Sequence, residues 1–315
     1  MDSHRPPHPT PITRRAALTV AAAVAATALL PRRLTAVPAE TSHVRPIPFS
    51  GELLPAIGLG TWITFNVGDD PLLRAERAEV LRAFFDEGGN LVDSSPMYGS
   101  SEAVVGYGLK HIPGPVNLFS ATKVWAPFGA RAEGQMAESR RLWGLDRFDL
   151  MQVHNLLNWK GLLPKLLEDR DAGLCRYVGV TTSHGRRHDE MAEVMAAQPI
   201  QFVQFSYNIV DRGVERRLLP MAADRGLAVI INRPFRTKEL FSLVGQRPLP
   251  DFAAEIDCAN WAQFFLKFVI SHPAVTCAIP ATSRISHLRQ NMGALWGPLP
   301  DAEMRARMVR YMDSL

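Results

Sequence analysis

Eight short apolar runs, each followed by a segment with helical spacing, restrict the fold of this chain more than any other feature of its sequence. The runs are continuous rather than alternating, which is typical of parallel strands covered on both faces. They lie at residues 56–60, 91–93, 118–123, 148–154, 176–180, 202–205, 228–231 and 275–280. Eight such units in about 260 residues favour a closed (β/α)8 barrel, the TIM-barrel architecture, over an open doubly wound sheet.

The segments between the runs carry apolar stripes at helical spacing. The clearest stripes occupy residues 80–85, 162–167 and 264–269, and each ends close to a glycine or proline, which is a common helix stop. These stripes are most simply explained as helix faces that pack on the core. The first apolar run is not followed by a Gly-x-Gly-x-x-Gly turn, which argues against a Rossmann domain. An extra C-terminal helix is expected at 301–312, on the outside of the barrel.

Residues 44–54 are predicted to form a short N-terminal β-hairpin, with a turn that ends at Gly51-Glu52. We expect this hairpin to close the bottom of the barrel. The chain then divides into a leader at 1–39, a linker at 40–47 and a single barrel domain at 48–315. A monomer is expected rather than an oligomer.

The first 39 residues have the pattern of an export signal. The paired arginines Arg14-Arg15 precede an apolar run of 15 residues at 16–30, and Val37-Pro38-Ala39 resembles a small-residue cleavage site. The paired arginines resemble the twin-arginine (Tat) export signal. The apolar run is shorter than the roughly 20 residues that a membrane span needs. An uncleaved membrane anchor remains the alternative.

This leader predicts that the twin-arginine export machinery carries the protein to the periplasm or the extracellular space. No stable membrane insertion is expected once the signal peptide has been cleaved. Because that machinery carries folded proteins, a bound cofactor is expected to be loaded in the cytoplasm before export.

Charge and cysteine content exclude several other classes of protein. The formal net charge is +4, and five of the arginines lie in the first 33 residues, so the rest of the chain is close to neutral. A nucleic-acid partner is not expected, because it would require a concentrated basic face. The three cysteines, Cys175, Cys258 and Cys277, show no metal-ligand spacing and are expected to be buried free thiols.

Titratable side chains stand where the predicted strands end. Asp93, Lys123 and His154 end three successive strands, and Tyr98 lies in the loop after Asp93. Each has an ordinary structural explanation on its own: a turn cap, a snorkelling lysine, a core histidine or a packed tyrosine. Their joint placement favours function, because active sites of this fold lie at the C-terminal ends of the strands.

The four side chains suit one reaction, the reduction of a carbonyl, which needs a hydride at carbon and a proton at oxygen. A phenol with a pKa near ~10 is a weak acid at neutral pH, and a neighbouring cation lowers that pKa. We therefore expect Lys123 to lower the pKa of Tyr98, and Asp93 to hold Lys123 by ion pairing. His154 is expected to orient the substrate oxygen beside Tyr98 by donating a hydrogen bond.

Four segments resemble the signatures of the aldo-keto reductase family. They are Leu59-Gly60-Thr61-Trp62, Val92-Asp93-Ser94-Ser95-Pro96-Met97-Tyr98-Gly99-Ser100-Ser101-Glu102, Thr122-Lys123 and Gln152-Val153-His154-Asn155. Their order and spacing match across the whole chain after the leader. The resemblance implies an enzyme that reduces aldehydes or ketones with NAD(P)H. It also implies a catalytic tetrad of Asp93, Tyr98, Lys123 and His154, with Tyr98 as the general acid.

The same resemblance implies a cofactor site. Its residues are Gly60, Thr61, Trp62, Asn155, Ser183, Gln204, Asn232, Arg233, Pro234, Phe235, Thr282, Arg284, Gln290 and Asn291. Ser183 and Gln204 would bind the nicotinamide carboxamide, and Gln290-Asn291 would hold the adenine. NADP(H) is favoured, since Thr282 and Arg284 are able to bind an adenosine 2′-phosphate. NAD(H) remains an alternative cofactor, because Arg284 is also interpretable as an ordinary surface arginine.

Three positions depart from the family pattern. His184 follows Ser183 where relatives often carry Asn. Asn232 or Arg233 occupies the place of the aromatic residue that usually stacks on the nicotinamide. Ala281 replaces the usual Lys of the phosphate loop.

Aromatic side chains on the loops after the strands are the candidates for a substrate pocket above the nicotinamide. We predict that Trp62, Trp125 and Phe128 wall this pocket. The same loops also carry Phe65, Asn155 and Trp159. No long segment follows the last expected helix, so the pocket is expected to be open and to accept a range of small carbonyl compounds.

Two other functional classes fit parts of the pattern. An exported nicotinamide-nucleotide sensor or partner protein on the same scaffold would bind the cofactor with little turnover, and the lack of an obvious NADPH supply outside the cytoplasm favours it. The complete tetrad favours catalysis instead, because a sensor would be free to lose Tyr98 or Lys123. A metal-dependent barrel hydrolase needs clustered His and carboxylate ligands. Only Asp93 and His154 qualify, so no metal is expected.

Overall fold

A closed barrel of parallel strands forms the centre of the part of the chain that the structure describes. The computed structural model describes residues 42–315, so the expected export signal at 1–39 lies outside the described residues. Eight strands, β3 to β10, follow one another in sequence order within one sheet. Parallel bridges from Ile57 to Ala278 and from Gly60 to Ala281 join its first and last strands. The predicted (β/α)8 barrel is confirmed.

The barrel strands are short and almost completely buried. They are β3 (Leu59–Gly60), β4 (Leu91–Asp93), β5 (Phe119–Val124), β6 (Phe148–Val153), β7 (Cys175–Thr181), β8 (Phe202–Ser206), β9 (Ala228–Asn232) and β10 (Cys277–Ala278). Each of these strands overlaps one of the predicted apolar runs. The runs are easy to recognise because a strand covered on both faces is apolar throughout and does not alternate with polar residues. All three cysteines are buried and free, as expected.

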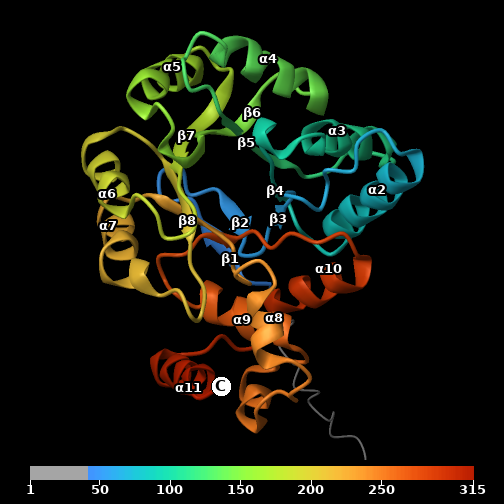
Figure 1. Cartoon of the computed structure of the whole chain (residues 1–315), viewed down its shortest axis with the longest axis vertical. Helices are drawn as coiled ribbons and strands as arrows, with labels where there is room; N and C mark the ends of the chain where they lie inside the picture. Colours follow the sequence, from blue (N-terminus) through green and yellow to red (C-terminus); the bar gives the residue numbers. More distant parts are fainter. Residues whose placement is uncertain (1–41) are drawn as a thin grey trace, which may run out of the picture. The chain divides into compact units, whose positions relative to one another are not determined.

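Helices alternate with the strands and surround them (Figure 1). The α-helices are α2 (Pro71–Asp86), α3 (Ser101–His111), α4 (Ala132–Trp143), α5 (Trp159–Asp171), α6 (His188–Ala197), α7 (Leu218–Asp224), α8 (Glu239–Val244), α9 (Trp261–Ile270), α10 (Ile285–Met292) and α11 (Ala302–Asp313). Short 3-10 turns are η1 (Pro96–Tyr98), η2 (His154–Leu156), η3 (Gly213–Arg216), η4 (Asp251–Ile256) and η5 (Gly293–Leu295). Within residues 42–315, no helix has the length and apolarity needed to cross a membrane.

Local sequence explains where helix α2 begins and ends. Asp70 Oδ1 accepts hydrogen bonds from the backbone N–H groups of Leu72 (2.9 Å) and Leu73 (3.0 Å), which satisfies donors that a helix start leaves free. Pro71 occupies the first turn, where its missing N–H has no cost. The helix stops before Gly88, whose φ of 84° is readily adopted only by glycine.

An antiparallel hairpin precedes the barrel. Its strands are β1 (Val44–Pro46) and β2 (Leu53–Pro55), and β1 lies within the segment 40–47 that the sequence suggested as a linker. Ile47 and Leu54 are fully buried and belong to the same apolar cluster as side chains from seven of the barrel strands. The hairpin is thereby packed against the barrel interior.

Helix α11 follows the barrel, and Arg305 is one of the side chains that attach it. Arg305 donates hydrogen bonds to Glu215 (2.7 Å) and to the hydroxyl of the buried Tyr207 (2.6 Å). Met308 and Met312 of the same helix are buried.

The turn of the hairpin is tied to the strands by another arginine. Arg176 of β7 pairs with Glu52 in the hairpin turn and with Asp149 of β6 (2.7 Å), and all three side chains are at least two-thirds buried. Asp149 also accepts hydrogen bonds from the backbone N–H (2.7 Å) and hydroxyl (2.9 Å) of Ser120. Arg176 therefore connects the hairpin to the N-terminal ends of the strands.

Replacement of Arg176 by alanine should lower the free energy of unfolding by about 1–3 kcal/mol, since it leaves two partly buried carboxylates without their cation. Denaturant unfolding followed by circular dichroism measures the change. Arg82→Ala is the matched control, because Arg82 pairs with exposed Glu79 and Asp86 and its replacement should leave the free energy of unfolding nearly unchanged. Equal losses in the two variants would contradict a special role for Arg176.

Candidate active site

A large cavity opens at the C-terminal ends of the barrel strands. Its volume is about 1230 Å³, above the ~300–1,000 Å³ range of ordinary small-molecule sites. Asp93, Tyr98 and His154 lie in its wall, and Lys123 is buried behind them. All fourteen residues expected to bind a cofactor, from Gly60 to Asn291, also line it. The barrel therefore brings the tetrad and the expected cofactor residues to one cavity.

The most buried interaction of the site is an ion pair between Lys123 and Asp93. Lys123 Nζ donates to Asp93 Oδ1 (2.5 Å) and to the backbone oxygen of Ser94 (2.8 Å). The other carboxylate oxygen, Oδ2, accepts from the side-chain amides of Gln152 (3.2 Å) and Gln204 (3.0 Å). Strand register explains the convergence, because Asp93 stands opposite Ala121 of β5 and Lys123 opposite Gln152 of β6.

Tyr98 lies beside this pair, and its pKa is raised. Lys123 Nζ is 5.1 Å from the centre of the Tyr98 ring. Burial is the main cause of the rise; the charge of Lys123 opposes it and that of Asp93 adds to it. The sequence predicted a lowered pKa for Tyr98, and this expectation is wrong for the net shift, because burial outweighs the cation. The phenol therefore keeps its proton at neutral pH.

Lys123 keeps its charge although it is completely buried. Burial alone would lower its pKa, but the neighbouring Asp93 and then Tyr98 raise it overall. A charged ammonium next to a protonated phenol stabilises the phenolate that forms when Tyr98 gives up its proton.

His154 is neutral and makes an edge-to-face contact with Tyr98. The two ring centres are 5.6 Å apart, at an angle of 84°. Burial, with the charge of Lys123 adding to it, lowers the pKa of His154 to about 3. Its Nδ1 lies 2.9 Å from the hydroxyl oxygen of Ser95. A neutral imidazole at this position is able to donate one hydrogen bond into the cavity.

Asn232, one of the two residues expected at the place of a stacking aromatic ring, is held by the ends of neighbouring strands. Its Oδ1 accepts from the hydroxyl of Ser206 (2.6 Å), and its Nδ2 donates to the backbone oxygen of Thr182 (2.9 Å). The side-chain amide of Asn232 therefore adds a polar group to the cavity lining and offers no aromatic surface.

The two other departures in this region contact each other. Arg233 Nη1 donates to Nε2 of His184 (2.8 Å). Because a guanidinium only donates, the proton of a neutral His184 lies on Nδ1, which donates to Ser183 Oγ (2.9 Å). The Ser183 hydroxyl in turn donates to Asn155 Oδ1 (3.3 Å). This chain orients the side chain of Ser183 within the cavity.

A cationic group of residues lines another part of the cavity wall. Its cations are Arg284 and Arg77, and Thr282 and His287 are neighbouring residues of the lining. Arg77 comes from α2; its Nε donates to the backbone oxygen of Thr64 (2.7 Å), its Nη1 to that of Ser283 (3.3 Å), and its side chain is 10% exposed. Arg77 was not predicted as a site residue, because a charged residue within a helical segment gives no sign of facing a cavity.

The aromatic residues on the loops after the strands, three of which were predicted to wall a substrate pocket, lie in different surroundings. Trp62 lines the cavity together with Ile63 and Met97, which were not predicted. Trp125 and Phe128 are not among the lining residues and are 40% and 94% exposed. The remaining two aromatic residues of these loops also lie outside the cavity lining. Phe65 is fully buried in the core, and Trp159 donates from Nε1 to Glu190 (2.7 Å).

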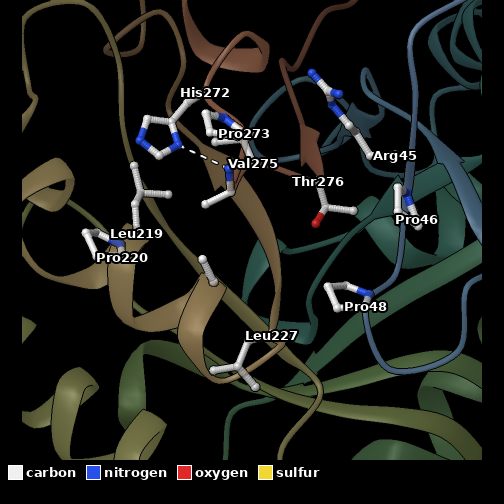
Figure 2. A pocket seen from close by; sticks show the side chains of 12 residues that line it. Arg45, Pro46, Pro48, Leu219, Pro220, Leu227, His272, Pro273, Val275 and Thr276 are labelled. Carbon is white, nitrogen blue, oxygen red and sulfur yellow. Dashed lines mark hydrogen bonds between the residues drawn. The ribbon is translucent and has the colours of Figure 1, made fainter.

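A second cavity of about 400 Å³ lies near the N-terminal ends of β9 and β10 (Figure 2). In Figure 2, Pro46 and Pro48 of the hairpin region lie across it from Leu219, Pro220 and Leu227. Its only titratable lining residues are Arg45 and His272. No group of His, Cys, Asp and Glu among the described residues is arranged to hold a metal ion. The chemistry-bearing residues are therefore concentrated at the C-terminal cavity.

The side chains of the large cavity fit a nicotinamide dinucleotide. Ser183, Gln204 and Asn155 offer hydroxyl and amide groups in its lining, with Gln204 bonded to Asp93, and Arg284 and Arg77 offer cations for a phosphate. The Aldo/keto reductase family model matches residues 56–242. This chain belongs to the aldo/keto reductase family. It is accordingly an NAD(P)H-dependent oxidoreductase.

Individual members of the aldo/keto reductase family are similar over most of their length. Methylglyoxal reductase YeaE of Escherichia coli is 30% identical over 271 residues, which cover 82% of this chain and 92% of that protein. A Klebsiella pneumoniae aldo/keto reductase crystallised with NADP and acetate is 25% identical, with a TM-score of 0.69 over 83% of this chain and 93% of its own. An aldo-keto reductase from Klebsiella pneumoniae in complex with NADPH is 26% identical, with a TM-score of 0.66 over 83% and 92% of the respective chains.

Proposed function

We propose that this protein reduces small aldehydes or ketones to alcohols with NADPH, and that Tyr98 is the general acid. The observation that carries the proposal is the buried Lys123–Asp93 ion pair next to Tyr98 and His154, at the wall of a cavity large enough for a dinucleotide. A buried charged pair beside a protonated phenol is an unfavourable arrangement for stability alone, and it suits proton transfer.

When bound, NADPH supplies the hydride that adds to the carbonyl carbon. The residues of this chain act on the carbonyl oxygen. Tyr98 donates its proton to that oxygen as negative charge develops there, and the charge of Lys123 stabilises the resulting phenolate. His154 donates a hydrogen bond to the same oxygen, and Asp93 keeps Lys123 charged and in place.

Small carbonyl compounds are the proposed substrates. Two relatives from Escherichia coli are named as methylglyoxal reductases, YeaE and an NADH-specific enzyme that is 26% identical over 233 residues. Trp62 supplies an apolar wall beside the tetrad. Trp125 and Phe128 lie outside the cavity lining and contact only a substrate that extends beyond it. Methylglyoxal is therefore a suitable first test compound.

Tyr98→Phe should retain NADPH binding and lose most carbonyl reduction, because it removes the proton donor and keeps the ring. Tryptophan fluorescence follows NADPH binding, and loss of NADPH absorbance on addition of aldehyde follows turnover. We expect at least a hundredfold lower kcat, in line with loss of general acid catalysis. Equal losses of binding and turnover would mean that Tyr98 is structural. Binding without turnover in the unmodified protein would favour the nucleotide-sensor alternative.

The cationic group supports NADP(H) as the preferred cofactor. Arg284 and Arg77 replace, by position in the cavity, the charge that Ala281 does not provide. Arg284→Gln should raise the Kd for NADPH about tenfold and leave that for NADH unchanged, because only NADPH carries the 2′-phosphate. Arg289→Gln is the matched control, since Arg289 lies on helix α10, which Arg284 directly precedes, but it pairs with Glu87 and does not line the cavity. Equal changes for both nucleotides would exclude a 2′-phosphate contact.

We further propose that residues 1–39 are a twin-arginine export signal that is cleaved after Ala39, and that the enzyme acts outside the cytoplasm. The support is the order Arg14-Arg15, apolar run, Val37-Pro38-Ala39. Replacement of Arg14 and Arg15 by lysine should retain the protein in the cytoplasm, as measured by cell fractionation. Mass spectrometry of the exported form should find Glu40 at its N-terminus. An uncleaved chain in the membrane fraction would favour the membrane anchor.

A further inference from the structure

Ser95 uses one hydroxyl group to contact both His154 and the turn that carries Tyr98. Its side chain is completely buried. The oxygen Oγ accepts a hydrogen bond from the backbone N–H of Met97 (3.2 Å) and so caps η1, the turn that carries Tyr98. The same oxygen lies 2.9 Å from Nδ1 of His154.

The direction of the hydrogen bond between Ser95 and His154 follows from counting donors and acceptors. The Met97 N–H only donates, so it occupies one lone pair of Oγ. If Nδ1 of His154 also donated to Oγ, the buried hydroxyl proton would have no acceptor, because Ser95 Oγ makes no other hydrogen bond within residues 42–315. A buried unsatisfied donor is strongly disfavoured. The hydroxyl therefore donates, and Nδ1 accepts.

We propose that Ser95 is a positioning residue that sets the tautomer of His154, so that the imidazole carries its proton on Nε2 and presents it to the carbonyl oxygen of the substrate. His154 lines the large cavity, and Nε2 makes no hydrogen bond to any described side chain or backbone group. The part of the inference that concerns the substrate rests on the proposed carbonyl reduction. The tautomer itself does not.

The arrangement gives His154 one fixed role. With Nδ1 occupied as an acceptor, the neutral ring has a single donor, and that donor is the group needed to stabilise negative charge on the oxygen. Lys123 contributes a nearby positive charge that disfavours a second proton on the ring. One hydroxyl thus orients His154 and, through the cap of η1, supports the turn that carries Tyr98.

Nitrogen-15 NMR of the imidazoles tests the tautomer directly, in the unmodified protein without substrate. The chain has nine histidines, so the His154 signals are assigned by difference from His154→Gln. We expect a protonated Nε2 and an unprotonated, hydrogen-bonded Nδ1. In Ser95→Ala the Nδ1 signal should move toward the position of a free imine nitrogen. A proton on Nδ1 in the unmodified protein would overturn the proposal, whatever the outcome of activity assays.

A double-mutant cycle separates action through His154 from the capping of η1. Ser95→Ala should lower kcat about tenfold, the effect of one lost hydrogen bond, with the Kd for NADPH unchanged. Ser95→Thr, which retains the hydroxyl, should recover most of the rate. In a His154→Gln background, Ser95→Ala should have little further effect. A further tenfold loss there would show that Ser95 acts through the cap and not through His154.

Ser120→Ala is the matched control for removing a buried serine hydroxyl. Ser120 lies in β5 and exchanges hydrogen bonds with Asp149, away from the cavity lining, so its replacement should leave kcat unchanged. If the unmodified protein reduces no carbonyl compound but His154 carries its proton on Nε2, the proposed function fails and the tautomer assignment stands. The two proposals are thus tested separately.

Discussion

The ion pair between Lys123 and Asp93 is the interaction on which the rest of the site depends. Two charges removed from water are unfavourable unless each is paired and hydrogen-bonded. Both conditions are met, because Ser94 satisfies the ammonium and Gln152 and Gln204 satisfy the carboxylate. The two charged residues lie on β4 and β5. Of their partners, Gln152 lies on β6, Gln204 lies on β8, and Ser94 directly follows β4. A closed parallel barrel brings such distant strand ends to one point, and the pair lies beside Tyr98, whose proton is retained chiefly because the phenol is buried.

The fold and the position of the site were predictable because their signals are local and repeated. Strand β4 was predicted at its observed bounds, and the ends of successive parallel strands had to meet, so the convergence of Asp93, Lys123 and His154 followed from topology. Burial was not predictable. Trp62 and Phe65 lie on one loop, yet one lines the cavity and the other is in the core. The upward pKa shift of Tyr98 was not predicted for the same reason. The order of the strands indicates that Lys123 lies near Tyr98, but it does not indicate that water is excluded from the phenol.

The departures from the family pattern make physical sense together. Asn232 and Arg233 stand where a stacking aromatic ring was expected, and Asn232 joins the hydrogen bonds among β7, β8 and β9 near their C-terminal ends. Arg233 and His184 then bond to each other and orient Ser183. A polar and cationic wall therefore stands where a stacked ring is usual. Such a wall leaves hydrogen bonds and phosphate contacts, rather than stacking, to hold a nicotinamide dinucleotide.

Two of the three histidines that line the cavity, His154 and His184, take opposite tautomers for the same reason. His154 accepts at Nδ1 because the backbone N–H of Met97 fixes the direction of the Ser95 hydroxyl. His184 accepts at Nε2 because Arg233 only donates. In both cases a donor that does not change with pH stands at the start of the chain of hydrogen bonds, and burial lowers the pKa of each histidine. The polarity of the site is therefore set by groups that do not titrate. In the proposed reaction, only Tyr98 then has to give up a proton, and Lys123 keeps its charge throughout.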